Sequence, residues 1–208
     1  VFSAPLAINL ILISLITGFG RILITALLGP EQNGLYSFDM KFGGVVTAFG
    51  SIFSMAGVEE AILRIGKSEA DSFFRKVVRN TTELLIALSL IALPVISLFF
   101  LLIANTEYYP AFSLVPAFLV YAVATVLSTV VGSVFQAVEK TEQIALTSFL
   151  GTIATVVISV FTIGRIGTLG VAWGLAAGSI VMLVLRYQFA LRHVSGLSLG
   201  LSNWLLIA

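Results

Sequence analysis

Long stretches without acidic residues, and almost without basic ones, constrain this chain more than any other feature. Five stretches of 17 or more residues carry no charge, and a sixth, Val1–Leu28, is interrupted by a single arginine. A helix needs about 20 apolar residues to cross a hydrocarbon layer of about 30 Å. Lipid offers no hydrogen-bond partners to the backbone, so such stretches are expected to be helical. The five uncharged stretches are Phe42–Val58, Leu84–Ala104, Ala111–Val138, Ile144–Ile163 and Leu169–Leu185. The sequence therefore predicts an all-α, polytopic membrane protein with six transmembrane helices.

Composition excludes several function classes. Hydrophobic residues make up 59% of the chain, charged residues 10%, and the net charge is +1. A nucleic-acid partner is not expected, because it requires a concentrated basic surface. The chain has no cysteine and one histidine, His193, so disulfides, thiolate chemistry and multi-histidine metal sites are not expected. We expect no cofactor and no enzymatic activity, since no usable carboxylate pair or His/Asp constellation is visible. A passive structural or partner-binding membrane subunit stays an open alternative.

The two ends predict that the chain is part of a longer protein. It begins at Val1 without a methionine, and it ends inside another apolar run, Leu197–Ala208. We expect residues 1–193 to form a six-helix transmembrane bundle and residues 194–208 to form a loop and the start of a seventh helix.

Basic residues alternate between the loops. The positive-inside rule places Lys- and Arg-rich short loops in the cytoplasm. The first outer loop, Gly29–Tyr36, and the second, Asn105–Pro110, have none, and the third has Arg165 alone. The other side has eight, namely Arg64, Lys67, Arg75, Lys76, Arg79, Lys140, Arg186 and Arg192. The N-terminal end of the chain is therefore expected on the cytoplasmic side of an inner membrane, with Tyr108 and Tyr109 at the outer interface.

The segment Ser68–Arg79 allows two interpretations. Ser68 with Asp71 three positions on is a helix-capping pattern. Apolar and basic residues then fall on opposite sides of a helix. The segment is either an interfacial helix on the inner leaflet or an extension of the third transmembrane helix.

Polar residues recur at helical spacing within three of the apolar stretches. They predict a shared hydrated cavity, although Ser and Thr also bond their own backbone or join neighbouring helices. The candidate residues of a transport path are Thr17, Arg21 and Thr25 in the first helix, Lys41 in the second, Tyr121, Thr125, Ser128 and Gln136 in the fourth, and Thr152 and Thr155 in the fifth.

Two of these candidates are charged. A charge inside hydrocarbon costs at least about 2.5–3.5 kcal/mol on insertion scales. Arg21 is interpreted as a contact for an anionic ligand, or as a snorkelling side chain or ion-pair partner of Asp39. Lys41 is a second cavity cation or an interfacial anchor.

Small residues and prolines predict helix packing. Gly170, Gly174 and Gly178 form two overlapping G-x-x-x-G units, and the second helix has a comparable small face from Gly43 to Ala61. Such faces let another helix approach closely. Pro94 and Pro116 each remove a backbone donor and tend to kink a helix.

Several segments resemble the polysaccharide flippases. The stretch GRILITALLGPEQNGLYSF (Gly20–Phe38) is similar to a helix–loop–helix in that family, with L-L-G-P-E followed by G-x-Y. FRKVVRNTTELLIALSLIALPVISLF (Phe74–Phe99) resembles its third helix, and RIGTLGVAWG (Arg165–Gly174) its last loop and helix start.

The resemblance implies membership of the multidrug, oligosaccharidyl-lipid and polysaccharide exporter superfamily, whose members have two six-helix bundles around a central cavity. This chain would then be one bundle, the C-terminal half, and its partner the remainder of its own chain. The implied function is the transfer of a polyprenyl-diphosphate-linked oligosaccharide from the inner to the outer leaflet of a prokaryotic cytoplasmic membrane. The alternative is an ion-coupled multidrug or small-molecule exporter of the same fold, with an unidentified coupling ion.

Overall fold

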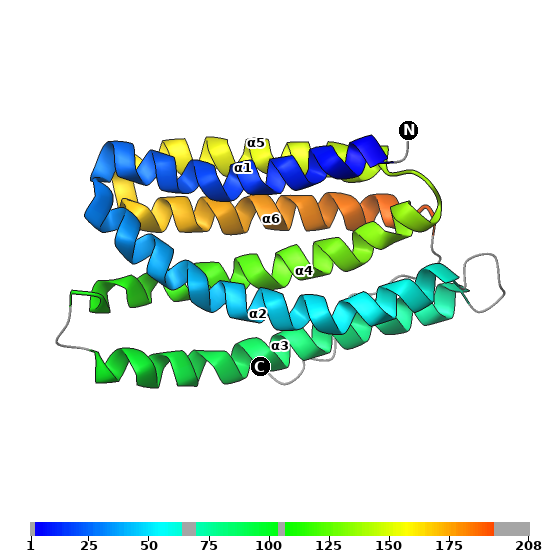
Figure 1. Ribbon diagram of the computed structural model, residues 1–208, viewed down its shortest axis with the longest axis horizontal. Coiled ribbons are helices and arrows are strands. Elements are labelled where there is room, and N and C mark those ends of the chain that lie inside the picture. Colours follow the sequence, from blue (N-terminus) through cyan, green and yellow to red (C-terminus); the bar gives the residue numbers. More distant parts are fainter. Residues whose placement is uncertain (1–2, 64–69, 104–106, 194–208) are drawn as a thin grey trace.

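The computed structural model describes residues 3–63, 70–103 and 107–193, and this part of the chain is almost entirely helical. Six α-helices and one short 3₁₀-helix, η1, follow one another (Figure 1). They are α1 (Ser3–Leu28), α2 (Pro30–Leu63), α3 (Ala70–Leu102), η1 (Tyr109–Leu114), α4 (Val115–Ala137), α5 (Glu142–Ile166) and α6 (Thr168–Ala190). The expected all-α architecture is confirmed.

Helix α6 lies at the centre of one side of the bundle. It packs most extensively on α5 and then on α4, while α1 packs on α5. In Figure 1, α1, α5 and α6 run side by side, and α2 crosses obliquely from the α1 side toward α3. Helix α2 contacts α1, α3 and α4, so it joins the two sides of the bundle.

Five of the described segments are long and apolar enough to cross a membrane. They are Ala7–Leu28, Asp71–Leu102, Tyr109–Ala137, Glu142–Ile166 and Thr168–Ala190. Large apolar side chains are exposed along these helices, Leu102 at 79% and Ile22 at 71% among them. An apolar exterior on long helices is the arrangement that a bilayer stabilises. The chain is therefore described as a multi-pass membrane protein.

The predicted outer loop Gly29–Tyr36 is wrong in extent. Helix α1 ends at Leu28, Gly29 adopts φ +93°, and α2 already begins at Pro30. A glycine with positive φ ends a helix without steric cost, and proline is favoured at the first helical position. Glu31 in the first turn adds favourable charge at the N-terminus. Asp39 and Lys41 consequently lie in the third and fourth turns of α2 rather than at its start.

Helix α3 settles the two interpretations of its basic entry. The helix is continuous from Ala70 to Leu102, so residues from Ala70 on extend the third helix; Ser68 lies outside the described residues. Phe74 and Val78 are buried in a cluster with Val134 and Phe135 of α4. The apolar side of this segment therefore packs on protein. Pro94 lies inside α3, as expected, whereas Pro116 is in the first turn of α4.

The predicted small-residue packing face of α6 is confirmed, and that of α2 is confirmed at Gly43 and Gly50, whereas Ser54, Gly57 and Ala61 lie outside the residues whose side chains are described. A Cβ added to Gly170 would lie 2.6 Å from Thr162 Oγ1, and one added to Gly178 would lie 2.6 Å from Gly151 O. Gly174 touches Ser159 in the same way, so α6 and α5 meet through glycines. On α2, a Cβ at Gly43 would lie 2.8 Å from Phe118 O of α4.

Candidate functional site

Two cations lie exposed on neighbouring helices. Arg21 on α1 and Lys41 on α2 are both exposed, and neither forms an ion pair with any residue of the described ranges. The alternative in which Arg21 pairs with Asp39 is not observed, since both carboxyl oxygens of Asp39 lack a partner. The two helices are antiparallel neighbours. Two positive charges without an ion pair among the described residues are therefore exposed on helices that contact each other.

The two cations lie at similar depths. Arg21 precedes the end of α1 at Leu28 by seven residues, and Lys41 follows the start of α2 at Pro30 by 11 residues. At 1.5 Å per residue these positions are about 10 and about 16 Å from the turn between the helices. Exposure to lipid at that depth costs about 2.5–3.5 kcal/mol per charge, which favours contact with water, protein or an anion instead.

The surface around these cations is open and lined with small residues. A Cβ added to Gly18, Gly34 or Gly44 would meet nothing within 4 Å. By the 100° helical spacing, Gly18 lies on the side of Arg21, and Gly34 and Gly44 lie on the side of Lys41. We define the cationic face as Arg21 and Lys41 together with these three glycines.

The remaining first-helix candidates border the cationic face. Thr25 Oγ1 donates to the carbonyl of Arg21 at 2.8 Å, and Thr17 Oγ1 donates to Ile13 O at 3.2 Å and Ser14 O at 3.0 Å. Thr25 is exposed and Thr17 is half-buried. Their hydroxyl protons are used within α1, so any ligand would meet them as hydrogen-bond acceptors.

The predicted polar rows of α4 and α5 meet at a small, partly open cavity. Tyr121, Thr125 and Thr155 line it together with apolar residues of α1 and α6, and its volume is about 20 Å³. A cavity of that size holds about one water molecule. Thr155 and Thr152 each donate to the carbonyl one turn earlier, at 3.0 and 2.8 Å. In this structure these hydroxyls stabilise helix contacts rather than line a wide passage.

One arginine is fully enclosed by the bundle. Arg186 of α6 is 2% exposed, and its guanidinium donates hydrogen bonds to three other helices. The acceptors are Ser128 O on α4 (2.9 Å), Thr147 Oγ1 (3.1 Å), Ser148 Oγ (2.7 Å) and Ile144 O (3.4 Å) on α5, and Asn9 Oδ1 on α1 (3.1 Å). Every acceptor is neutral. The positive charge is thus solvated by the protein without a carboxylate among the described residues.

The structure corrects the prediction for Arg186, which the loop pattern placed after the sixth helix among the cytoplasmic basic residues. Helix α6 continues to Ala190, so Arg186 is one turn inside. Gly132 of α4 leaves room for the guanidinium, with Nη1 3.1 Å from its would-be Cβ. The missed signal was the spacing of Ser179, Met182 and Arg186, which share one side of α6.

Two candidates of α4 lie toward that same end of the bundle. Ser128 is buried, and its backbone carbonyl accepts a hydrogen bond from Arg186. Gln136 is half-buried and lies one residue before the end of α4. The structure therefore divides nine of the ten predicted residues among the cationic face and its border, the small cavity and the end of the bundle that holds Arg186. The tenth, Thr152, lines none of them.

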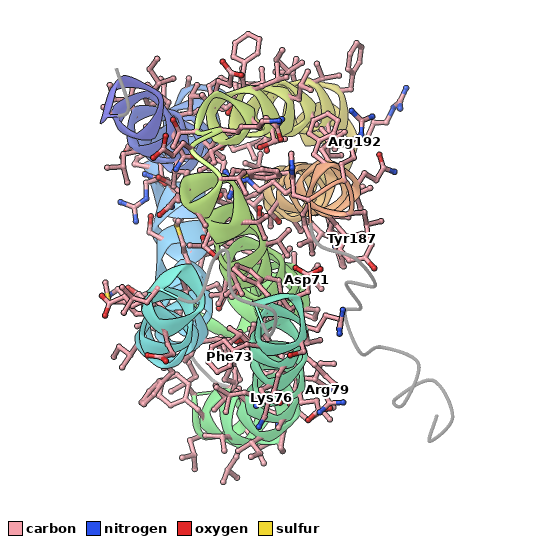
Figure 2. All side chains as sticks on the ribbon, turned by 90° about the vertical axis from the view of Figure 1, so that its right-hand side faces the viewer. Asp71, Phe73, Lys76, Arg79, Tyr187 and Arg192 are labelled. Atoms are coloured by element: carbon pink, nitrogen blue, oxygen red, sulfur yellow. The ribbon has the colours of Figure 1, made fainter. Side chains whose placement is uncertain are left out.

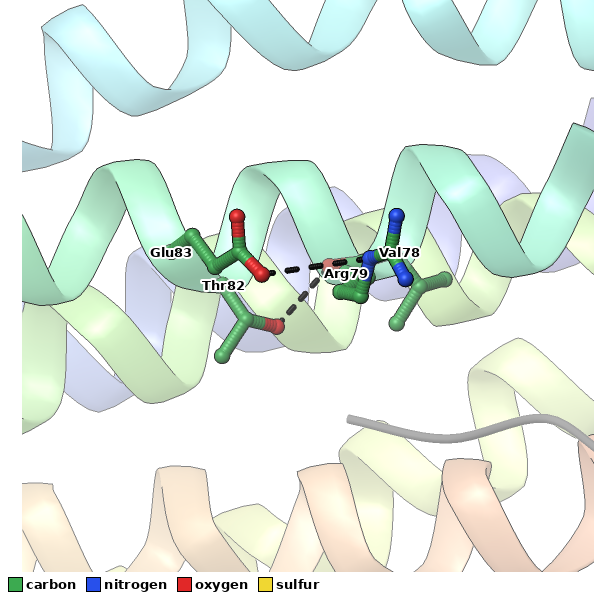
Figure 3. Close-up of polar contacts among 4 residues, drawn as sticks. All are labelled: Val78, Arg79, Thr82 and Glu83. Atoms are coloured by element: carbon green, nitrogen blue, oxygen red, sulfur yellow. Dashed lines mark hydrogen bonds and ion pairs between the residues drawn. The ribbon is translucent and has the colours of Figure 1, made fainter. Parts of the chain in front are cut away.

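Basic side chains gather where α3 begins and α6 ends. Figure 2 looks onto this end of the bundle and shows Lys76 and Arg79 together with Arg192. Arg79 Nε lies 3.8 Å from Glu83 Oε1, and Thr82 Oγ1 donates to Val78 O at 2.8 Å (Figure 3). The Arg192 guanidinium lies 5.4 Å from the centre of the Phe189 ring.

His193 reports on the charge at this end. Burial lowers the pKa of its imidazole, and the nearby cations Lys140 and Arg192 lower it further. Apart from Arg165 at the opposite end of α5, the described basic residues of the turns thus lie at one end of the bundle, as the loop pattern predicted. Arg64 and Lys67 lie outside the described residues.

Comparisons with models of protein families, with curated proteins and with solved structures found no match to this chain.

Proposed function

We propose that this chain is one six-helix bundle of a two-bundle membrane transporter, with α2 as the sixth membrane-crossing helix. Its cargo is an oligosaccharide linked to a polyprenyl diphosphate, which moves from the inner to the outer leaflet by alternating access. The basic end of the bundle would face the cytoplasm. The second bundle, from the remainder of the chain, would cover the cationic face across a hydrated cavity.

The observation that carries this proposal is the cationic face. Arg21 and Lys41 are exposed at membrane depth and unpaired within the described residues. A diphosphate headgroup cannot cross hydrocarbon unaided, and it needs positive charge in a water-accessible space. An arginine fork matches phosphate oxygens in a bidentate manner, and a lysine adds a mobile point charge.

Buried Arg186 supports the same account from inside the bundle. A positive charge without a carboxylate partner adds to the potential that attracts anions. Its bonds to α1, α4 and α5 also hold these helices together with α6 at one end of the bundle.

A second candidate is favoured by Asp39. An ion-coupled exporter of drugs or small molecules, with the same architecture, would use an acidic group within its helices. Asp39 is fully buried in α2 and is such a group. The two candidates differ in cargo, so an export assay distinguishes them.

Charge reversal at Arg21 tests the first candidate. In the full-length protein, Arg21→Glu is expected to lower surface polysaccharide in the native cell at least about tenfold, the effect of losing about 1.4 kcal/mol of cargo binding. Arg165→Glu is the matched control, because Arg165 is an exposed arginine in the last turn of α5 and is not a predicted transport-path residue.

Normal polysaccharide export by Arg21→Glu, with the protein present at the wild-type level, would refute the anion-contact role. Unchanged polysaccharide together with lost resistance to toxic cations would favour the second candidate instead.

A further inference from the structure

Asp39 is the ionisable side chain whose burial is least compensated. None of its surface is exposed, and neither Oδ1 nor Oδ2 has a hydrogen-bond partner. Arg186, the other buried acidic or basic side chain of the described residues, is surrounded by neutral acceptors that solvate its charge. The fold therefore supplies hydrogen-bond acceptors to the buried Arg186 but supplies no partner to the buried carboxyl of Asp39. Burial alone does not account for this difference.

The position of Asp39 is the contact between α2 and α4. Tyr36 and Gly43 lie three residues before and four residues after it, on the same side of α2. The Tyr36 ring packs edge-on against Phe118 at 5.1 Å between ring centres, and Gly43 lies against the Phe118 carbonyl. Both neighbours therefore press against Phe118, and the carboxyl between them is closed in by α4.

No cation among the described residues forms an ion pair with the carboxyl in this enclosure. Lys41 lies two residues on, on another side of α2. Arg21 of α1 and Tyr121 of α4 are the titratable groups that interact with Tyr36, and neither bonds to Asp39. The stretch of α3 from Leu84 on and α6 before Arg186 have no titratable side chain, and η1 contributes only Tyr109.

A carboxylate in such a place is far more costly than a neutral carboxylic acid. Burying an isolated ionised carboxylate costs many times more than burying a neutral polar group, and proteins avoid that cost by neutralising the group. We propose that Asp39 is a proton-binding site, occupied while α2 and α4 are in contact and emptied when they separate.

The proton balance is simple. In the closed arrangement one carboxyl oxygen of Asp39 holds the proton through an O–H bond. When α2 moves away from α4, water reaches the carboxyl, the O–H bond breaks, and the proton leaves on water while the electron pair stays on Asp39. Contact between α2 and α4 is then favoured by proton binding, and it becomes less favourable as the pH rises.

This inference does not depend on the cargo of the transporter. It concerns a side of α2 that faces α4, whereas the proposed function depends on the cationic face. A protein that fails the polysaccharide assay with Arg21→Glu can still have a proton on Asp39, and the reverse also holds.

Infrared spectroscopy of the purified full-length protein tests the site directly. The wild-type minus Asp39→Asn difference spectrum at neutral pH is expected to show the carbonyl stretch of a protonated carboxylic acid. Glu31→Gln is the matched control, because Glu31 is an exposed carboxyl of the same helix. The band assigned to Asp39 should persist unchanged in the spectrum of the Glu31→Gln variant.

Thermal stability gives a second readout. Asparagine has the shape of the neutral acid, so Asp39→Asn should be at least as stable as the wild type at neutral pH. It should also lose less stability than the wild type from neutral to alkaline pH. Asp39→Leu provides the same difference spectrum if the asparagine variant is not recovered.

Ionised carboxylate bands for Asp39 at neutral pH would overturn the proposal. Equal loss of stability at alkaline pH in the wild type and Asp39→Asn would do the same.

Discussion

Replacing Gly178 by alanine would place a methyl group where α5 and α6 are closest. The new Cβ would lie 2.6 Å from Gly151 O and 3.0 Å from Thr155 Cβ, and closer still to Thr155 Oγ1. Two of these neighbours are a backbone oxygen and a Cβ, which cannot rotate away. The two helices would have to separate along a contact that is the most extensive in the bundle.

The expected magnitude is the difference of two terms. Alanine in a helix interior is favoured over glycine by about 0.5–1 kcal/mol. Overpacking a close contact costs about 1–3 kcal/mol. Gly178→Ala should therefore lower the free energy of unfolding by about 1–2 kcal/mol, while Gly44→Ala, where nothing lies within 4 Å of the added Cβ, should not lower it.

Unfolding by a denaturing detergent, followed by tryptophan fluorescence, measures this difference, with Trp173 of α6 as one reporter. Adding Thr155→Ala to Gly178→Ala should restore part of the loss, because it removes the nearest atom but leaves Gly151 O in place. Equal stability of Gly178→Ala and Gly44→Ala would show that α5 and α6 do not meet through this glycine.

Three further changes follow from the buried and terminal groups. Arg186→Lys keeps a buried charge but loses the planar guanidinium that reaches three helices, whereas Arg186→Met removes the charge at similar volume. In detergent unfolding, Arg186→Lys should therefore be about 1–3 kcal/mol less stable than Arg186→Met. The reverse order of stability would contradict this. Tyr36→Phe removes a buried hydroxyl that has no hydrogen-bond partner among the described residues. It should leave the free energy of unfolding unchanged or raise it by about 1 kcal/mol in the same assay. A clear loss of stability would reveal a hydrogen bond to that hydroxyl. Lys140→Ala should raise the pKa of His193 in an NMR titration, since one of the cations that lower it is removed, and an unchanged titration would place Lys140 too far away.

Much of the helical framework followed from local patterns. Uncharged stretches of membrane length located the helices, because lipid leaves the backbone no alternative to internal hydrogen bonds. Gly170, Gly174 and Gly178 identified a packing face, since glycines at that spacing permit close approach whatever the partner helix is. The ends were less certain: polar residues after Gly29 resembled a loop, yet Pro30 and Glu31 start a helix there.

The candidate site residues were also only partly predictable from the sequence. Arg21 was recognisable from sequence because a charge within an apolar run is conspicuous and its exposure on α1 follows from one helix alone. Arg186 was not recognisable, because it stands at the edge of its run, and only the approach of α1, α4 and α5 supplies its acceptors.

The sequence by itself determined that this chain forms membrane-length helices, where most of them lie and which of their faces are small enough to touch. Those properties depend on residues near one another along the chain. The tertiary packing was needed to show that Asp39 is enclosed without a hydrogen-bond partner among the described residues and that Arg186 is enclosed with five acceptors. It was also needed to show that Arg21 and Lys41 are exposed on helices that contact each other. The physical reason is that the solvation of a charge in a low-dielectric bundle is set by atoms from other helices, whose distances no local pattern contains.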